Sequence, residues 1–304
     1  MQSFFTRHHA IATIAASTLA FMLTGCAGGP VDGASSPVTR IVALGDSNID
    51  NGNLLRMSGG TFPPLPNWQG RNSNGPNVVE HLSKRLNAKL DDYGVSGATT
   101  GEGNIVSNKA VPGVVLSHTG VAAQVADLEK TPNTRFTSSD LVVLWAGSND
   151  IYGVLRSDRV KLNQQIVTAA SNIEAAIDTL NGMGAQRFVV ANRTPRAALG
   201  TDTDLNGVDL NKAIDAAIKR ARAKTGADVR LYDAYSAIAN MMKNPAKYGF
   251  KEVNTLCWNV PTCASDPLAG GLPVANTYVN WDAAHKTTRV HQLMAEQIEQ
   301  MLKH

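Results

Sequence analysis

The amino-acid sequence predicts an α/β protein, namely a three-layer α/β/α sandwich around a central parallel sheet of about five strands. Short apolar runs alternate along the chain with longer segments of helical periodicity, and this alternation is typical of βαβ units. Three of the apolar runs also lead directly into turns rich in glycine, serine and asparagine. Such turns are expected where parallel strands end together at one edge of a sheet.

The expected strands are continuous apolar runs, as in strands that are buried on both faces of a parallel sheet. The run Asp-Leu-Val-Val-Leu-Trp at Asp140–Trp145 is the strongest example. The five strands are expected at Arg40–Leu44, Asp91–Val95, Asp140–Trp145, Arg187–Ala191 and Val229–Tyr232.

The expected helices lie between and after these strands. In the first of them Val78, Val79, Leu82 and Leu86 recur at helical spacing, so this side is predicted to pack on the sheet. The helices are expected at Asn77–Leu86, Val121–Leu128, Val160–Leu180, Val208–Ala223 and Thr287–Leu302.

The composition is that of a folded domain with no footprint for nucleic acid. Of the 304 residues, 43% are hydrophobic and 17% are charged, which suits one sizeable globular domain. The formal net charge is +3, and the lysines and arginines are scattered rather than gathered in a run. Nucleic-acid binding requires a basic patch or stripe, so no nucleic-acid partner is predicted.

Residues 1–25 are predicted to be a lipoprotein signal peptide. A weakly basic start around Arg7 precedes the uncharged stretch 10–23, whose length suits a signal peptide and is too short for a membrane span. The stretch ends in Leu23-Thr24-Gly25-Cys26, which resembles the lipobox of bacterial lipoproteins. This resemblance implies lipidation of Cys26 and, with Ala27 next to it, an anchor in the outer membrane. The alternative is an ordinary cleaved signal peptide with a chance cysteine.

Two different regions follow the signal peptide. Residues 26–38 are rich in glycine, serine and proline and are expected to form a flexible tether. Residues 39–304 are expected to form the folded domain, because the alternating strands and helices all fall within them.

Two further cysteines, Cys257 and Cys263, stand close together in the sequence. In an exported protein such a pair indicates a disulfide, which would fix the segment that precedes Trp281 and Asp282. A metal site is the competing interpretation, but no second pair of cysteines or histidines stands nearby at ligand spacing. We therefore predict a disulfide, and neither a metal nor a cofactor.

Four short motifs stand where predicted strands end or where the last helix begins. They are Gly-Asp-Ser-Asn at 45–48, Gly-Val-Ser-Gly-Ala-Thr at 94–99, Gly-Ser-Asn-Asp at 147–150 and Trp-Asp-Ala-Ala-His at 281–285. Because the carboxyl ends of parallel strands share one edge of the sheet, these motifs are expected to form one site there.

The side chains of these motifs are the components of an acyl-transfer site. The Ser47 hydroxyl is a weak nucleophile unless a base stands beside it, and His285 can be that base. Asp282, three residues earlier, can hold the Nδ1–H of the histidine and stabilise the imidazolium. The backbone N–H of Gly97 and the side-chain amide of Asn149 can stabilise an oxyanion.

Each motif residue also has a simpler explanation when it is taken alone. Serine is a common helix N-cap, while Gly97 and Asn149 could be ordinary turn residues. Asp46 is expected to hold its turn by hydrogen bonds to the backbone, and Asp150 could simply be a turn former. Of the seven histidines in the chain, only His285 has an acidic residue at the expected offset.

Together the four motifs resemble the four sequence blocks of the SGNH hydrolases, also called GDSL hydrolases, and they occur in the order of that family. The resemblance covers nearly all of the chain after the tether and implies a flavodoxin-like sheet. Carried over by position, Ser47 matches the nucleophile, Asp282 and His285 match the acid and base, and Gly97 and Asn149 match the oxyanion hole. No Gly-x-Ser-x-Gly, P-loop or His-Glu-x-x-His motif supports a rival mechanism.

Further features are similar to the larger bacterial members of that family, those described as phospholipases, lecithinases, hemolysins and lipid acyltransferases. They are the stretch Gly-Arg-Asn-Ser-Asn-Gly-Pro at 70–76 and the Cys257–Cys263 loop. There are two departures from the pattern. Asn48 stands where the family name has leucine, and Lys286 stands where many members have proline. Neither removes a reacting group, but Lys286 places a charge near the base.

The resemblance implies an esterase that cleaves lipid or other acyl esters through an acyl-serine intermediate. Phospholipase and acyltransferase activities fall within this expectation, as does action at a membrane through the lipid anchor. A carbohydrate or cell-wall O-acetyl esterase is the alternative, because one fold hosts many substrates. A third hypothesis is a surface lipoprotein that binds a ligand and has lost activity, but the intact set of Ser, His and Asp argues against it.

Overall fold

A computed structural model describes residues 37–106, 111–132, 134–264 and 273–304. The predicted signal peptide, the lipidation site Cys26 and nearly all of the tether lie outside the described residues. Within the described ranges a five-stranded sheet runs in the order β2-β1-β3-β4-β5, and every pairing in it is parallel. The predicted fold class is therefore confirmed.

Four of the five predicted strands agree closely with the structure, and one was misplaced. The strands are β1 (Arg40–Gly45), β2 (Lys89–Asp92), β3 (Asp140–Trp145), β4 (Arg187–Ala191) and β5 (Asp228–Tyr232). The strand expected at Asp91–Val95 begins and ends earlier, because the Asp92 carboxylate accepts the backbone N–H of Gly94 at 2.8 Å and turns the chain. Tyr93 and Val95 still donate backbone hydrogen bonds to β1.

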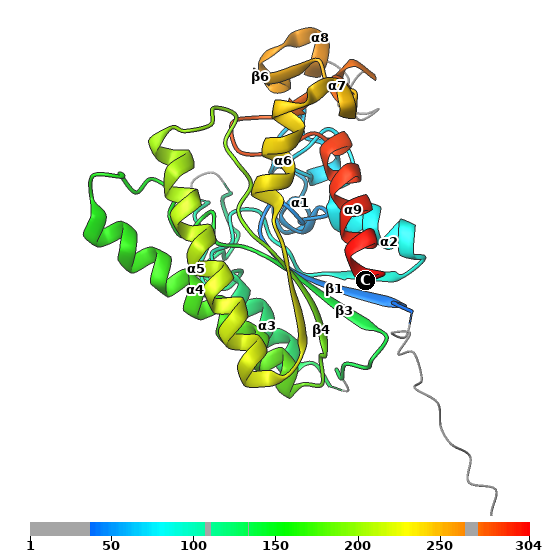
Figure 1. Ribbon diagram of the computed structural model, residues 1–304, viewed down its shortest axis with the longest axis vertical. Helices are drawn as coiled ribbons and strands as arrows, with labels where there is room; N and C mark the ends of the chain where they lie inside the picture. The colour runs from blue at the N-terminus through cyan, green and yellow to red at the C-terminus, as the bar shows by residue number, and fades with distance from the viewer. Residues whose placement is uncertain (1–36, 107–110, 133, 265–272) are drawn as a thin grey trace, which may run out of the picture. The chain divides into compact units, whose positions relative to one another are not determined.

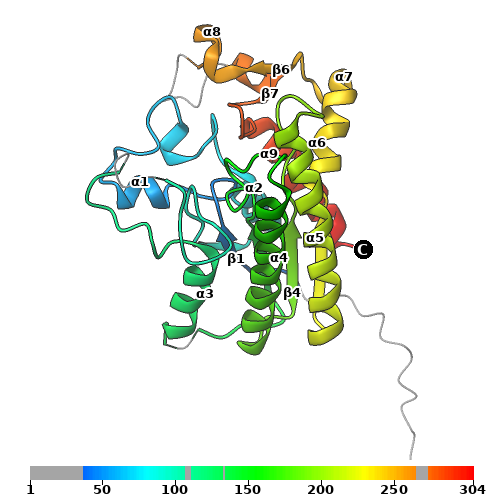
Figure 2. The same ribbon diagram turned by 90° about the vertical axis from the view of Figure 1, so that its left-hand side faces the viewer.

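Two helical layers cover the sheet, one on each side (Figures 1 and 2), and alternate residues of β1 face one layer or the other. Val42 and Leu44 of β1 face the first layer, whereas Ile41 and Ala43 face the second. The first layer contains α3 (Val121–Lys130), α4 (Arg159–Gly182) and α5 (Asp202–Thr225), and the second contains α2 (Val78–Leu86), α6 (Ala234–Lys243) and α9 (Thr288–Leu302). The central strands of the sheet are thus covered on both faces, as in a doubly wound fold.

Side-chain caps fix where two of these helices begin. At α2 the Asn77 side chain accepts the N–H of Glu80, and the Glu80 carboxylate accepts the N–H of Asn77, a reciprocal capping box. Helix α5 begins before the predicted Val208, because Thr201 caps its first turn and Asp202 lies in that turn. An acidic side chain in the first turn stabilises the helix through its interaction with the positive end of the helix dipole.

A second, two-stranded parallel sheet was not predicted. It pairs β6 (Glu252–Leu256) with β7 (Tyr278–Asn280). The predicted disulfide joins Cys257 and Cys263, and both cysteines are buried with Trp281 in a small apolar cluster. The other short elements are α1 (Asn53–Met57), η1 (Trp68–Gly70), α7 (Pro245–Tyr248), η2 (Cys257–Asn259), α8 (Pro261–Ala264) and η3 (Pro273–Thr277).

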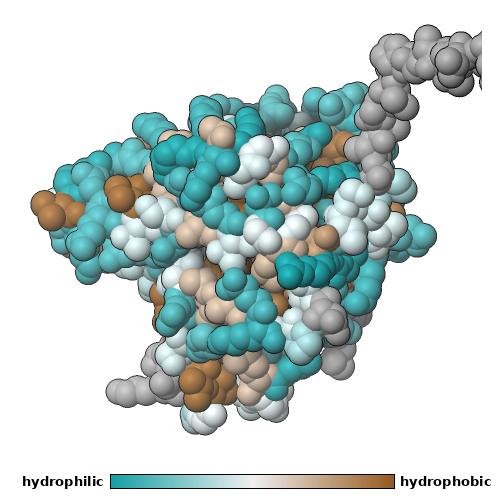
Figure 3. All heavy atoms as spheres, turned by 90° about the horizontal axis from the view of Figure 1, so that it is seen from below, coloured by the Kyte–Doolittle hydropathy of each residue, from teal (hydrophilic) through white to brown (hydrophobic). Residues whose placement is uncertain are grey.

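The face of the molecule seen in Figure 3 is mixed rather than continuously apolar. In the view of Figure 3 the hydrophobic residues form separate patches between hydrophilic ones. No helix in the described ranges combines the length and apolar character needed to cross a bilayer. Nor do three or more His, Cys, Asp or Glu side chains come together there as a metal site.

Candidate active site

The site lies at the point of the sheet where the strand order reverses. In the order 2-1-3-4-5 the connections run opposite ways from β1 and β3, and ligands bind outside the carboxyl ends of the strands at this point. Ser47 follows β1, and Asn149 follows β3. Together with Gly97 and His285 they line one pocket of about 240 Å³. The four motifs therefore meet as the sequence predicts.

A hydrogen-bonded series joins a serine, a histidine and an aspartate in this pocket. The Nε2 atom of His285 lies 2.8 Å from the Oγ atom of Ser47. On the other side of the ring, Nδ1 lies 2.8 Å from Oδ2 and 3.0 Å from Oδ1 of Asp282. This geometry lets the imidazole accept the serine proton while the carboxylate holds the Nδ1–H.

Asp282 is itself held in place by the turn that contains it. Its Oδ1 atom accepts the backbone N–H of Ala284 at 2.7 Å and that of His285 at 2.8 Å. Burial by itself would raise the pKa of Asp282, but the neighbouring charge of His285 and the hydrogen bonds outweigh burial and hold this pKa below its usual value. The carboxylate thus stays ionised where an imidazolium would form.

The conformation of Ser47 is set by the residues next to it. The Asp46 N–H donates to the Trp145 carbonyl of β3 at 3.0 Å, and Asp46 Oδ1 accepts both the backbone N–H and the side-chain amide of Asn48. Burial raises the pKa of Asp46 to about 6, although the hydrogen bonds from Asn48 lower it. The departure from leucine at position 48 therefore supplies an additional hydrogen bond beside the serine.

Three donors surround the space next to the Ser47 hydroxyl. Among the described residues, the backbone N–H groups of Ser47 and Gly97 donate to no protein acceptor. The side-chain amide of Asn149 donates to the Ala98 carbonyl at 2.8 Å, and an NH₂ group has a second hydrogen to donate. Gly97 has a φ of 85°, and a Cβ there would overlap the Asn104 side chain, so only glycine fits.

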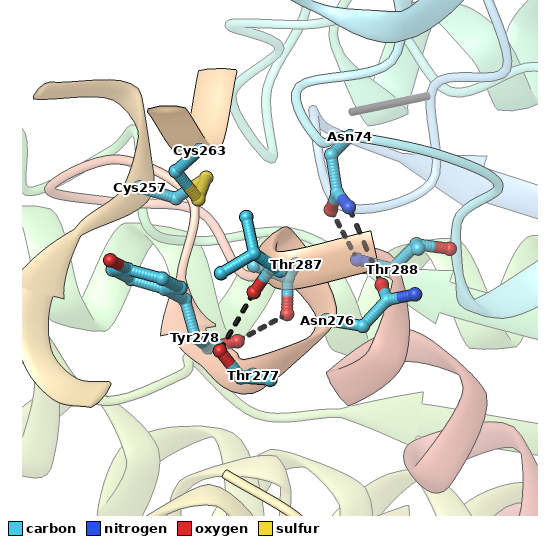
Figure 4. The surroundings of a disulfide bond; sticks show 9 residues. Asn74, Cys257, Cys263, Asn276, Thr277, Tyr278, Thr287 and Thr288 are labelled. Carbon is cyan, nitrogen blue, oxygen red and sulfur yellow. Dashed lines mark hydrogen bonds between the residues drawn. A yellow bond between two sulfur atoms is a disulfide. The ribbon is translucent and has the colours of Figure 1, made fainter. Parts of the chain in front are cut away.

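Polar contacts from distant segments hold the turn that carries His285. The Ser73 hydroxyl donates to the carbonyl of Lys286 at 2.9 Å, and Asn74 Oδ1 accepts the N–H of Thr288 at 2.8 Å. Figure 4 shows this Asn74 contact on one side of the turn and the disulfide on the other. The stretch 70–76 thus has a positioning role for the last motif.

Lys286 is buried against this turn and does not face the pocket. Its Nζ atom donates to the carbonyl of Pro195 at 2.8 Å and to Oδ1 of Asn280 at 2.6 Å. Burial lowers the pKa of Lys286 to about 7. The lysine that replaces proline therefore ties the β7 turn to the segment after β4.

Several residues that line the pocket were not predicted. Two of them, Arg193 and Arg196, follow β4 at the same edge of the sheet as the other motifs, and this position was the signal that could have found them. The other unpredicted lining residues are Phe62, Asn72, Ser96, Ile105, Val106, Ser148, Tyr152, Thr194 and Ala284. The four tryptophans are not among the lining residues, and Trp145 is buried in the core as predicted.

The fold and this site define an α/β protein with a Ser–His–Asp series that is suited to acyl transfer. The chain belongs to the GDSL-like lipase/acylhydrolase family, whose family model matches residues 41–298. It is accordingly an ester hydrolase that acts on carboxylic esters.

The relatives in sequence include bacterial and plant proteins. The chain is 26% identical over 291 residues to the thermolabile hemolysin of Vibrio parahaemolyticus. This alignment covers 88% of this chain and 65% of the hemolysin. It is 25% identical to a GDSL esterase/lipase of Arabidopsis thaliana, covering 85% of this chain and 84% of the relative. It is 26% identical to the phosphatidylcholine-sterol acyltransferase of Aeromonas hydrophila, covering 72% of this chain and 65% of that protein. The chain thus spans less than two thirds of the two bacterial relatives.

Solved structures of similar proteins are more distant in sequence. An acetylxylan esterase from Geobacillus stearothermophilus shares 13% identity with a TM-score of 0.48, over 88% of this chain and 96% of that one. A lipolytic G-D-S-L family protein from Veillonella parvula shares 14% identity with a TM-score of 0.45, over 86% of this chain and 97% of that one.

Proposed function

We propose that this protein hydrolyses lipid esters through an acyl-serine intermediate, with Ser47 as nucleophile and His285 as general base. The observation that carries the proposal is the 2.8 Å contact between Ser47 Oγ and His285 Nε2, with Asp282 hydrogen-bonded to the opposite ring nitrogen. An activated serine requires this arrangement of nucleophile, base and orienting acid.

In the first half of the reaction, Ser47 Oγ attacks the ester carbonyl carbon and its proton passes to His285 Nε2. The oxyanion that forms accepts hydrogen bonds from the N–H groups of Ser47 and Gly97 and from the Asn149 amide. The C–O bond to the alcohol then breaks, and the alcohol leaves with the proton from His285. In the second half, water attacks the acyl-serine with His285 again as base, which releases the acid and restores Ser47.

Two kinds of observation support a lipid acyl group. The lining of the pocket includes the apolar side chains of Phe62, Ile105 and Val106, which suit a hydrocarbon chain. The similar bacterial proteins include a hemolysin and a phosphatidylcholine-sterol acyltransferase. Another alcohol in place of water at the second step would make the enzyme an acyltransferase.

The test is hydrolysis of p-nitrophenyl esters from acetate to palmitate by wild type and by Ser47→Ala. We expect the substitution to lower kcat by at least ~10⁴-fold with unchanged thermal stability, because it removes the attacking atom. We also expect turnover of acyl chains longer than acetate. Activity on acetate alone would indicate an O-acetyl esterase, and equal rates for the two proteins would contradict a serine mechanism.

We further propose that Cys26 is lipidated and anchors the domain to the outer membrane. The support is the lipobox-like sequence Leu23-Thr24-Gly25-Cys26, since several acyl chains together hold a protein stably on a bilayer. Expression of the full chain in the presence of radiolabelled palmitate is expected to label the wild type. The Cys26→Ser variant is expected to be unlabelled and absent from the outer-membrane fraction. Label in both proteins would contradict lipidation at this cysteine.

A further inference from the structure

Two arginines stand in the wall of the pocket that holds Ser47. Arg193 and Arg196 come from the segment that follows β4, and both line this pocket together with Ser47 and His285. They also line an adjoining hollow next to Tyr152. The two arginines therefore line both hollows.

Neither arginine has the acidic partner that a buried cation ordinarily needs. Within the described ranges neither one forms an ion pair, and their guanidinium hydrogen bonds go to backbone carbonyls. Arg193 Nη1 donates to the carbonyl of Thr203 at 3.1 Å, and Arg196 Nη1 to that of Ala283 at 3.5 Å. The Nε atom of Arg196 is buried with no hydrogen-bond partner. A guanidinium with so few hydrogen-bond partners is costly to bury.

The nearest acids already accept hydrogen bonds from other groups. The Asp204 carboxylate accepts the backbone N–H groups of Arg196 and Gly200 and the hydroxyl of Tyr235. Asp282 is held by His285 and Ala284. Their charges help to keep the arginines protonated, but neither carboxylate is paired with a guanidinium.

Two other partly buried arginines of the described residues, Arg40 and Arg71, are paired with carboxylates. Arg40 makes a two-point contact with the carboxylate of Asp140, and Arg71 makes one with Glu80. Burial lowers the pKa of Arg193 to about 10, so this guanidinium keeps its charge at neutral pH.

Helix α5 also leaves room for one of the two arginines. A Cβ atom at Gly207, inside this helix, would overlap Nη1 of Arg193. Glycine within a helix lowers helix stability by ~1 kcal/mol relative to alanine. A side chain at position 207 would therefore require the Arg193 guanidinium to move.

The strand order separates the charged part of the pocket from its apolar part. Arg193 and Arg196 follow β4 on one side of Ser47. Ile105 and Val106 belong to the segment after β2, on the other side of β1. An ester bound at Ser47 can thus place its acyl chain toward β2 and its alcohol part toward β4.

We propose that Arg193 and Arg196 form a subsite for a phosphate group on the alcohol part of the substrate. The preferred substrates are then glycerol esters that carry a phosphomonoester or phosphodiester. This inference rests on the proposed esterase function and further specifies that the preferred substrate carries a negatively charged phosphate. Guanidinium groups suit phosphate because their N–H donors match its oxygens in pairs.

The test compares three short-chain esters with the same acyl groups: dibutyroylglycerol, dibutyroylglycerol phosphate and dibutyroylglycerol phosphocholine. We measure kcat/KM for wild type, Arg193→Met, Arg196→Met and Arg196→Lys. The matched control is Arg220→Met, which removes an exposed arginine that pairs with Glu174.

For wild type we expect the two phosphate esters to be preferred over the neutral ester. Each Met variant is expected to lower this preference by ~10- to 100-fold, the value of a charged hydrogen bond, with partial recovery in Arg196→Lys and no change in Arg220→Met. A loss for the phosphomonoester alone would show that the subsite binds a terminal phosphate group, and an equal loss for both phosphate esters would show that it binds the phosphate of either headgroup. An unchanged preference, or an equal fall for all three esters, would overturn the subsite.

A binding measurement separates this inference from the esterase function. Calorimetric titration with sn-glycerol 3-phosphate requires no turnover, and Ser47→Ala is expected to bind it as wild type does. Binding at least ~10-fold weaker in Arg196→Met is expected from the lost charged contact. Absence of binding to the wild type would overturn the subsite even if ester hydrolysis is intact. Failure to hydrolyse any ester, with binding retained, would instead contradict the proposed function.

Discussion

Ser47 and His285 reach the same pocket from two differently built regions. Ser47 follows β1, a central strand whose side chains from Ile41 to Leu44 are almost completely buried. His285 lies on a turn outside the central sheet, next to the small sheet of β6 and β7. The first region is positioned by the apolar core, whereas the second is positioned by individual polar contacts and one disulfide.

This difference indicates how each region should respond to substitution. Tight packing in a core tolerates little change in volume, so changes beside Ser47 should appear as lost stability. A turn held by separate hydrogen bonds can lose one of them and stay folded, so changes beside His285 should appear first in activity. The following predictions test this contrast, beginning with the largest expected effect.

Replacement of Asp282 by asparagine should lower kcat by ~10³- to 10⁴-fold, because the amide favours the wrong tautomer of His285. Steady-state hydrolysis of a p-nitrophenyl ester measures this loss, and thermal unfolding should show a nearly unchanged midpoint. The matched control is Asp215→Asn, an exposed carboxylate on α5 that pairs with Lys219. Activity within a few-fold of wild type in Asp282→Asn would remove Asp282 from the mechanism.

Replacement of Gly45 by alanine should destabilise the fold by ~3 kcal/mol or more. Gly45 has a φ of 154°, and its added Cβ would overlap the backbone carbonyl of Trp145. Urea unfolding measures the effect. Gly182→Ala is the control, because no atom lies within 4 Å of a Cβ at this helical position. Equal stabilities for the two variants would contradict the claim that packing in the core holds the region of Ser47.

Replacement of Lys286 by methionine should remove part of the pH dependence of stability. Its pKa is about 7 in the folded protein and 10.5 in its ordinary state, so between these values the unfolded chain holds a proton that the folded chain lacks. The free energy of unfolding of wild type should therefore rise with pH above 7, by up to ~1.4 kcal/mol per pH unit from this group. The difference between the two proteins should change over pH 7 to 9 in urea titrations.

The control for this measurement is Lys251→Met, at an exposed lysine. Its stability should stay at a constant difference from that of wild type across the same pH range. A constant difference for Lys286→Met as well would show that Lys286 keeps its proton in the folded state, contrary to the direction given by its burial.

Replacement of both Cys257 and Cys263 by serine should lower the free energy of unfolding by ~2 kcal/mol, because the disulfide closes only a short loop. The Cys-to-Ser protein should also lose activity, since both cysteines pack on Trp281, which precedes Asp282 and His285. Reductant should reproduce both effects in wild type and leave the double variant unchanged. A loss of stability without any loss of activity would show that the disulfide does not position the base.

The alternation of apolar runs with helical segments was sufficient to predict the fold class, because local periodicity reports burial directly. The edge strand β2 was misplaced because its residues, Lys-Leu-Asp-Asp, are only partly buried and give little apolar signal. The sheet of β6 and β7 was missed for the same reason, since β6 has no fully buried residue. Pattern reading thus succeeds where a strand is covered on both faces and fails at the periphery.

The sequence by itself determined which reacting groups the chain contains and their order, because Ser47, Asp282 and His285 stand in short motifs. Only the tertiary structure decided their distances, since Ser47 and His285 are 238 residues apart in sequence and 2.8 Å apart in space. It also placed Arg193 and Arg196 in the same pocket and buried Lys286 beneath the histidine turn. Such contacts depend on packing between distant segments. The sequence around an Arg or Lys does not show whether an acidic side chain will lie next to it in the folded protein.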